Sequence, residues 1–177
     1  MKSTLSTLLC LPLFFVLASC SDSMKDAQTA DTETQTDSTT RILLTEVPVG
    51  KSNYLISIPE NYVLTENEGP DFYVYYINPS DSTDTLSFTA GMYFGNHPSK
   101  FKPLNDSCIT DVMNGIILES NTDWTVYNCK GSYSAQTIAD SKSDEGWNAL
   151  VHAFGNGRSE ADVHQVIDIF ATLRKKK

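Results

Sequence analysis

The sequence has 177 residues, with 13 Lys or Arg and 22 Asp or Glu, and its formal net charge at pH 7 is −9. Nucleic acids and anionic lipid surfaces are bound through clustered cations, so an acidic chain argues against both kinds of partner. We therefore expect no nucleic-acid partner.

The first twenty residues predict an export signal. Lys2 supplies a positive charge, and the apolar run from Leu8 to Ala18 is too short to remain as a membrane-spanning helix. The run ends in Leu17, Ala18, Ser19 and Cys20, which resemble the lipobox of bacterial lipoproteins. An ordinary secretory signal cleaved near Ser19 is the alternative.

The lipobox resemblance implies that residues 1–19 are removed and that Cys20 becomes an acylated N-terminus. Several acyl chains hold a protein on a membrane almost permanently, without a spanning helix. By the same resemblance, Ser21 in place of an aspartate favours the outer membrane. The expected location is the cell envelope, on an undetermined face of that membrane.

Residues 21–40 predict a flexible tether. They contain nine Ser or Thr and five Asp or Glu, and no aromatic or branched aliphatic side chain. Such a segment cannot offset the entropy that ordering would cost. With Cys20 it forms a tether over residues 20–40, which leaves residues 41–177 as a single domain.

The first half of this domain predicts strands. Residues 42–47 and 54–58 suit a hairpin, residues 72–77 a third strand, and residues 65–70 an exposed acidic loop. The clearest alternation spans residues 85–94, and it predicts one buried face made of Leu86, Phe88, Ala90, Met92 and Phe94.

The second half predicts further strands and one helix. Residues 109–116 fit a short helix or a strand, and residues 122–129, 132–139 and 146–154 fit antiparallel strands. From Ser159 a helix is predicted with Asp162 completing a capping box. Its apolar stripe is Val163, Val166, Ile167, Phe170 and Leu173. The basic run at 174–177 is expected to complement the helix dipole.

This order of elements predicts an α+β domain, in which an antiparallel sheet of six or seven strands is covered by a C-terminal helix. The motif Tyr-Leu-Ile-Ser-Ile-Pro-Glu-Asn-Tyr at 54–62 and the closing Ile-Phe-Ala-Thr-Leu at 169–173 resemble the PsbP-like fold. The resemblance implies a binding or assembly module rather than an enzyme, and it transfers no site residue.

Cys108 and Cys129 are an even pair in an exported domain, and such pairs are usually bridged. We expect a disulfide; two unlinked buried thiols are the alternative.

Metal and catalytic motifs are not evident. His97, His152 and His164 have no ligand spacing, and the acidic turns lack the glycine of a calcium loop. The chain has no nucleophile elbow, phosphate loop or dinucleotide fingerprint. We therefore expect no cofactor, no metal and no enzymatic activity.

The aromatic run at 72–77 places large side chains on both faces of its strand. We predict that Tyr73 and Tyr75, with Trp124 from a later strand, form an exposed recognition ridge for an envelope protein. The alternative is that both sheet faces are covered and these rings are core. The expected function is a lipid-anchored, non-enzymatic binding or assembly module; a periplasmic immunity protein that neutralises a secreted toxin is the alternative.

Overall fold

The computed structural model describes residues 42–177, apart from 71, 82–87, 104, 145 and 147. The signal sequence, Cys20 and the tether lie outside the described residues. The elements are, in order, β1 (Leu44–Pro48), β2 (Tyr54–Pro59), β3 (Tyr62–Glu68), β4 (Tyr73–Pro79), β5 (Phe88–Gly95), β6 (Ile109–Ile117), β7 (Ser120–Asn128), β8 (Tyr133–Asp140), β9 (Leu150–Gly157), α1 (Glu160–Ala171) and β10 (Arg174–Lys175).

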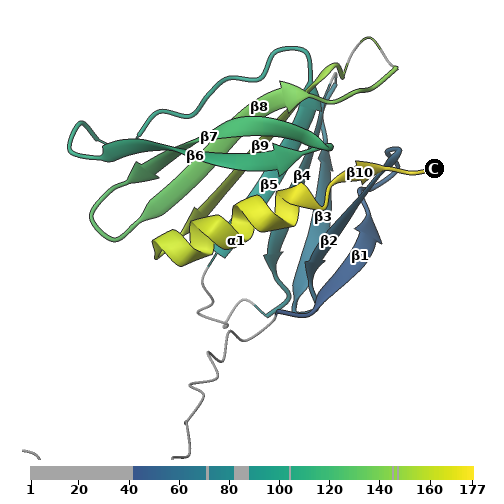
Figure 1. Cartoon of the computed structure of the whole chain (residues 1–177). Coiled ribbons are helices and arrows are strands. Elements are labelled where there is room, and N and C mark those ends of the chain that lie inside the picture. The colour runs from purple at the N-terminus through teal and green to yellow at the C-terminus, as the bar shows by residue number, and fades with distance from the viewer. Residues whose placement is uncertain (1–41, 71, 82–87, 104, 145, 147) are drawn as a thin grey trace, which may run out of the picture. The chain divides into compact units, whose positions relative to one another are not determined.

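The strands form two antiparallel sheets. One has seven strands in the order β3-β4-β5-β9-β8-β7-β6, and the other has three in the order β1-β2-β10. Strand β5 pairs with β9 rather than with β6. The antiparallel strands β6 to β9 therefore join the sheet through β9, and β6 forms its far edge. Figure 1 shows α1 lying across the larger sheet, with β1, β2 and β10 to one side. The predicted α+β architecture is confirmed at this level.

The alternating pattern of β5 builds the face that α1 covers. Phe88, Ala90, Met92 and Phe94 are all buried, as predicted, and Leu86 lies outside the described residues. On β9, Ala153 pairs with Met92 and Val151 pairs with Phe94. Because alternate residues of paired strands share one face, the core extends across the neighbouring strands.

Helix α1 begins as predicted. The Ser159 hydroxyl accepts from the Asp162 N–H, and the Asp162 carboxylate accepts from the Ser159 N–H at 2.9 Å. The predicted apolar stripe is buried, with exposures of 0 to 5 % for Val163, Val166, Ile167, Phe170 and Leu173. Within the described part of the chain, no helix is long and apolar enough to cross a membrane.

Glycine at two positions on the sheet lets α1 lie close to it. A Cβ built on Gly155 of β9 would be 2.6 Å from the Val166 side chain, and one on Gly115 of β6 would be 2.6 Å from Ile167. Real Cβ atoms do not approach other atoms so closely. Of the two structures predicted for residues 109–116, helix or strand, the strand is present as β6, and Gly115 makes room for the helix packed on it.

Two sequence predictions are wrong, and the first is the acidic loop. Residues 65–70, predicted as an acidic loop, mostly belong to edge strand β3, because every residue from Tyr62 to Glu68 pairs with β4. Charged side chains are tolerated there since only one long edge of the strand is bonded.

The basic run at 174–177 lies beyond the last turn of α1, which contains no basic residue. Instead, Arg174 and Lys175 form β10 against β2, and Arg174 donates to both carboxylate oxygens of Glu46 at 2.9 Å. The chain turns out of the helix at Thr172, whose hydroxyl accepts from the Ser57 N–H at 2.8 Å.

The disulfide between Cys108 and Cys129 is present in the structure, with 4.3 Å between the two Cα atoms. It lies one step beyond Ile109 and Asn128, the last paired residues of the β6–β7 hairpin. The bond therefore closes the open end of this hairpin, in which β6 is an edge strand that pairs with β7 and packs against α1.

Trp124 provides a test of the helix packing. It is fully buried, and its ring centroid lies 5.6 Å from that of Phe170 on α1. We expect Trp124→Ala to lower the free energy of unfolding by about 3–5 kcal/mol, since it removes a large core side chain. The measurement is urea denaturation of the full chain, with Val112→Ala as the control, because Val112 is 57 % exposed on the same hairpin. A loss below about 1 kcal/mol for Trp124→Ala would contradict this packing.

Candidate ligand-binding pocket

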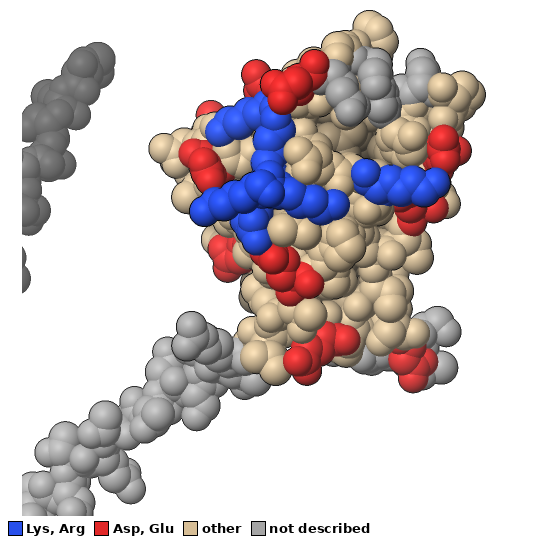
Figure 2. Space-filling model, turned by 90° about the vertical axis from the view of Figure 1, so that its right-hand side faces the viewer, with Lys and Arg blue, Asp and Glu red and all other residues tan. Residues whose placement is uncertain are grey.

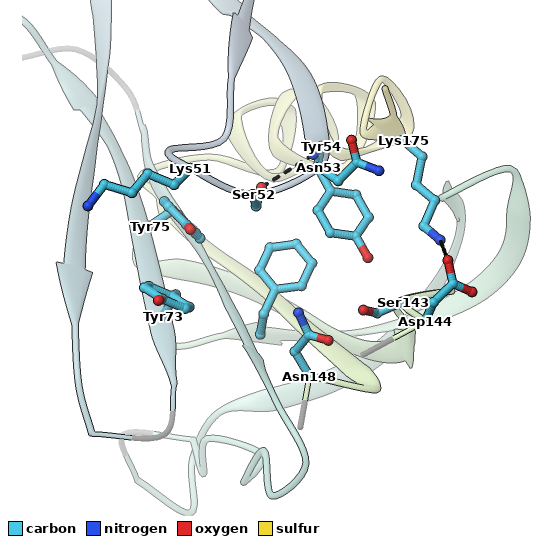
Figure 3. A pocket seen from close by; sticks show the side chains of 11 residues that line it. Lys51, Ser52, Asn53, Tyr54, Tyr73, Tyr75, Ser143, Asp144, Asn148 and Lys175 are labelled. Carbon is cyan, nitrogen blue, oxygen red and sulfur yellow. Dashed lines mark hydrogen bonds and ion pairs between the residues drawn. The ribbon is translucent and has the colours of Figure 1, made fainter. Parts of the chain in front are cut away.

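A pocket of about 300 Å³ opens beside the small sheet, between segments that are far apart in the sequence. It is formed by the turn between β1 and β2, the starts of β2 and β4, the end of β5, the β8–β9 connection and β10 (Figure 3). We call it the tyrosine pocket; its lining residues are Lys51, Ser52, Asn53, Tyr54, Tyr73, Tyr75, Phe94, Ser143, Asp144, Asn148 and Lys175.

Three buried aromatic rings form the floor of the tyrosine pocket. Tyr54 and Phe94 stack with their centroids 4.8 Å apart and an angle of 22° between the rings, and Tyr75 meets Phe94 edge-on at 6.1 Å. The Tyr54 hydroxyl donates to the Ser141 carbonyl at 2.8 Å. All three rings are at most 3 % exposed, so neighbouring side chains hold them in place.

Tyr73 forms a wall of the tyrosine pocket. It is half-buried, and its ring centroid lies 6.4 Å from that of Tyr75. The register of β4 places Tyr73 and Tyr75 opposite Phe94 and Met92 of β5, which belong to the core face. A ligand in the pocket would therefore meet one partly accessible tyrosine above a fixed aromatic floor.

The predicted recognition ridge of Tyr73, Tyr75 and Trp124 is wrong. Tyr75 is 1 % exposed and Trp124 is fully buried, because both point to the face that α1 and the small sheet cover. Trp124 also lies on β7, so β5, β9 and β8 separate it from β4. The aromatic residue of this strand that lies on the opposite face is Tyr76, whose ring contacts Phe154 at 6.4 Å.

Cationic side chains lie around the rim of the pocket. Lys51 and Lys175 come from opposite sides in Figure 3, and Lys175 Nζ is 3.4 Å from a carboxylate oxygen of Asp144. Lys176 lies next to them, since its Nζ donates to the Ser52 carbonyl at 2.7 Å. Figure 2, seen from the side that carries β10, shows Lys and Arg side chains gathered on this face. The gathering opposes the net charge of the chain, which is −9.

The hydroxyl of Tyr75 stays neutral over the whole physiological range. Burial raises the pKa of Tyr75, and the Glu66 carboxylate raises it further. Gly50 allows Glu66 and Tyr75 to lie against the β1–β2 turn. Its φ is +51°, and a Cβ there would be 1.8 Å from Glu66 Oε2 and 2.6 Å from the Tyr75 ring. The turn before Lys51 can therefore lie directly against both side chains.

The structure brings no metal site together among the residues it describes, where no group of three or more His, Cys, Asp or Glu could hold an ion. His164 lies on α1, 4.0 Å from Glu160, while His97 is exposed in the β5–β6 connection. Asp71, Asp84 and Glu145, which belong to the acidic turns of the sequence, lie outside the described residues.

A second hollow, of about 190 Å³, lies on the face of the seven-stranded sheet that is opposite to α1. Phe101, from the β5–β6 connection, lies over this face, with its ring 4.8 Å from that of His152. The side chain of Gln136 ties it down: its Oε1 accepts from the Phe101 N–H at 2.8 Å, and its Nε2 donates to the Phe101 carbonyl at 2.7 Å. His152 Nε2 is 3.1 Å from the same Oε1.

Comparison with protein-family models, with curated proteins and with solved structures found no match to this chain. The pocket therefore has to be interpreted from its own chemistry.

Sequence reasoning missed most of the tyrosine pocket. Lys51, Asn148 and Lys175 carry no local motif, and their elements meet only because β10 pairs with β2 and the β8–β9 connection folds over β5. The one available signal was the unusual density of tyrosine at 73–76.

His152 predicts a pH dependence of stability. Burial, with a smaller contribution from Lys100, lowers the pKa of His152 to about 4, from an ordinary value of 6.5. The unfolded chain therefore takes up this proton before the folded chain does. The contribution of neutral His152 to the free energy of unfolding is complete above about pH 6.5. It is lost as the pH falls towards 4, and the loss reaches up to about 3 kcal/mol.

When the pH is lowered from 7 to 4.5, we expect the free energy of unfolding to fall less in His152→Gln than in the unmodified chain. The measurement is urea denaturation at both pH values. His164→Gln, at an exposed histidine, serves as the control and should behave like the unmodified chain. Equal losses in His152→Gln and the unmodified chain would mean that His152 is not the group responsible.

Proposed function

We propose that this protein is a lipid-anchored lipoprotein of the bacterial envelope whose folded domain is a non-enzymatic binding module. In this proposal residues 1–19 are a signal peptide, Cys20 carries the lipid, residues 20–40 are a tether and residues 41–177 form the domain. The tyrosine pocket is the binding site. The observation that carries the proposal is this pocket, with its rigid aromatic floor and cationic rim.

The anchor is supported by the Leu17 to Cys20 motif at the end of the apolar run. Ser21 supports the outer membrane as the destination. The order of a hairpin, a meander and a closing helix, together with the motif at 54–62, supports a PsbP-like variant of the α+β fold.

The composition of the tyrosine pocket supports binding rather than catalysis. Among the described residues that line it there is no histidine and no cysteine, and the Ser52 hydroxyl donates to the Val49 carbonyl at 2.5 Å. An activated serine requires a general base within hydrogen-bond reach. A lysine beside tyrosines and amides is instead a common way of binding a polar ligand.

Anchoring is tested with Cys20→Ala. We expect this variant to leave the membrane fraction and to enter the aqueous phase on detergent phase separation, because it removes the acyl chains. Ser19→Ala, which keeps a small residue before the cysteine, is the matched control and should stay in the detergent phase. Partition of Cys20→Ala into detergent would contradict the lipoprotein assignment.

The binding site is tested by photo-crosslinking in cells. A benzophenone side chain in place of exposed Asp144, on the rim of the pocket, should form an adduct with an envelope component, and one in place of exposed Val112, on the β6–β7 hairpin, should not. Adding Tyr73→Ala to the Asp144 probe should reduce the adduct at least about threefold with the protein still folded, as checked by its circular dichroism. Equal adducts at both positions, or none at Asp144, would contradict the proposed site.

A further inference from the structure

We propose that the ligand of the tyrosine pocket is a sugar residue carrying a carboxylate, of the uronic-acid or muramic-acid type; this inference rests on the proposed function. The volume of about 300 Å³ is at the small end for ligand sites, and it suits one or two sugar rings. Three features of the lining define the chemistry of the ligand.

The pocket offers one partly accessible aromatic ring, that of half-buried Tyr73. Tyr54 and Phe94, which stack on each other and are at most 3 % exposed, hold the floor beside it in place. The C–H bonds on one side of a pyranose ring can pack against the Tyr73 ring through weak but additive contacts. A phosphate ion alone would leave this surface unused.

The walls are suited to hydroxyl groups. The side chains of Asn53 and Asn148 are amides, which can donate and accept, and Ser143 adds a hydroxyl on another side (Figure 3). The Ser52 hydroxyl donates to the Val49 carbonyl, so towards the pocket it can act as an acceptor. A sugar hydroxyl is itself both donor and acceptor, so it matches such groups. A purely aromatic acid would cover these polar atoms without replacing their contacts with water, which costs binding energy.

The rim is suited to a carboxylate. Asp144 is fully exposed, so its contact with Lys175 is a surface ion pair that contributes little and is easily exchanged. A ligand carboxylate can take the place of Asp144 on Lys175, while Lys51 raises the local potential from the other side. On a chain with a net charge of −9, this group of cations favours an anionic ligand.

The same rim does not resemble a phosphate site. Phosphate is commonly held by bidentate arginine or by a helix N-terminus. Arg174 is engaged with Glu46 through Nε and Nη2, and no residue of α1 lines the pocket. The carboxylate sugar is the ligand class that uses the floor, the walls and the rim together.

The test is ligand-observed NMR with the full acylated chain in detergent, at low salt. The probes are D-glucuronate, D-galacturonate and N-acetylmuramic acid, with D-glucose, D-galactose and acetate as matched probes that lack either the charge or the ring. We expect at least one acidic sugar to bind at least about tenfold more tightly than every matched probe. Binding of no acidic sugar, or equal binding of the neutral sugars, would overturn the proposal.

Variants show whether the binding is at this pocket. Lys51→Gln with Lys175→Gln should weaken the binding of the acidic sugar at least about tenfold. Lys100→Gln with Lys130→Gln makes the same change in net charge away from the pocket and should leave the affinity within about twofold. Equal weakening by both pairs would mean that the pocket is not the site. Tighter binding of a trigalacturonate than of the monomer would identify a polymeric glycan as the source, and equal binding would identify a free sugar.

The outcome is separable from that of the proposed function. If no acidic sugar binds while the adduct at Asp144 persists and depends on Tyr73, the ligand class is wrong and the binding module stands. If the adduct is absent as well, both are wrong.

Discussion

The close packing of α1 on the seven-stranded sheet is the contact on which the rest of the domain depends. It is possible because Gly155 and Gly115 leave room for Val166 and Ile167. The helix decides which face of the sheet is core, and its end at Ala171 sends the chain into β10. The pairing of β10 with β2 then brings Lys175 to the rim of the tyrosine pocket. One helix–sheet contact thus determines both the core and the location of the site.

The fold was largely predictable where the signal is local. The alternation in β5 and the capping box at Ser159 are encoded within a few residues, and both were predicted correctly. Residues 109–116 were ambiguous because a glycine can interrupt a helix or make room for one, and the difference depends on a partner about fifty residues away. The acidic stretch at 65–70 was misjudged because an edge strand tolerates the same charged residues as a loop.

The site was less predictable, because it is a product of register between distant strands. The sequence showed that aromatic residues of β4 must point to both faces, and they do, since Tyr75 is in the core and Tyr76 contacts Phe154 on the other side. Which set faced inward depended on the side of the sheet that α1 would cover. The strand pattern contains no information on that choice, and so the sequence alone does not show that Tyr75 faces inward.

The three-stranded sheet has a mechanical consequence. Strand β1 is the first element of the domain, and the turn at its far end lines the tyrosine pocket. A pull applied between residue 42 and a ligand held at Lys51 would pass along β1 through its covalent backbone. The five paired positions with β2 lie beside this path, so the pull does not act to separate them. The domain therefore stays folded when a ligand bound at this turn is pulled against the N-terminal side of β1.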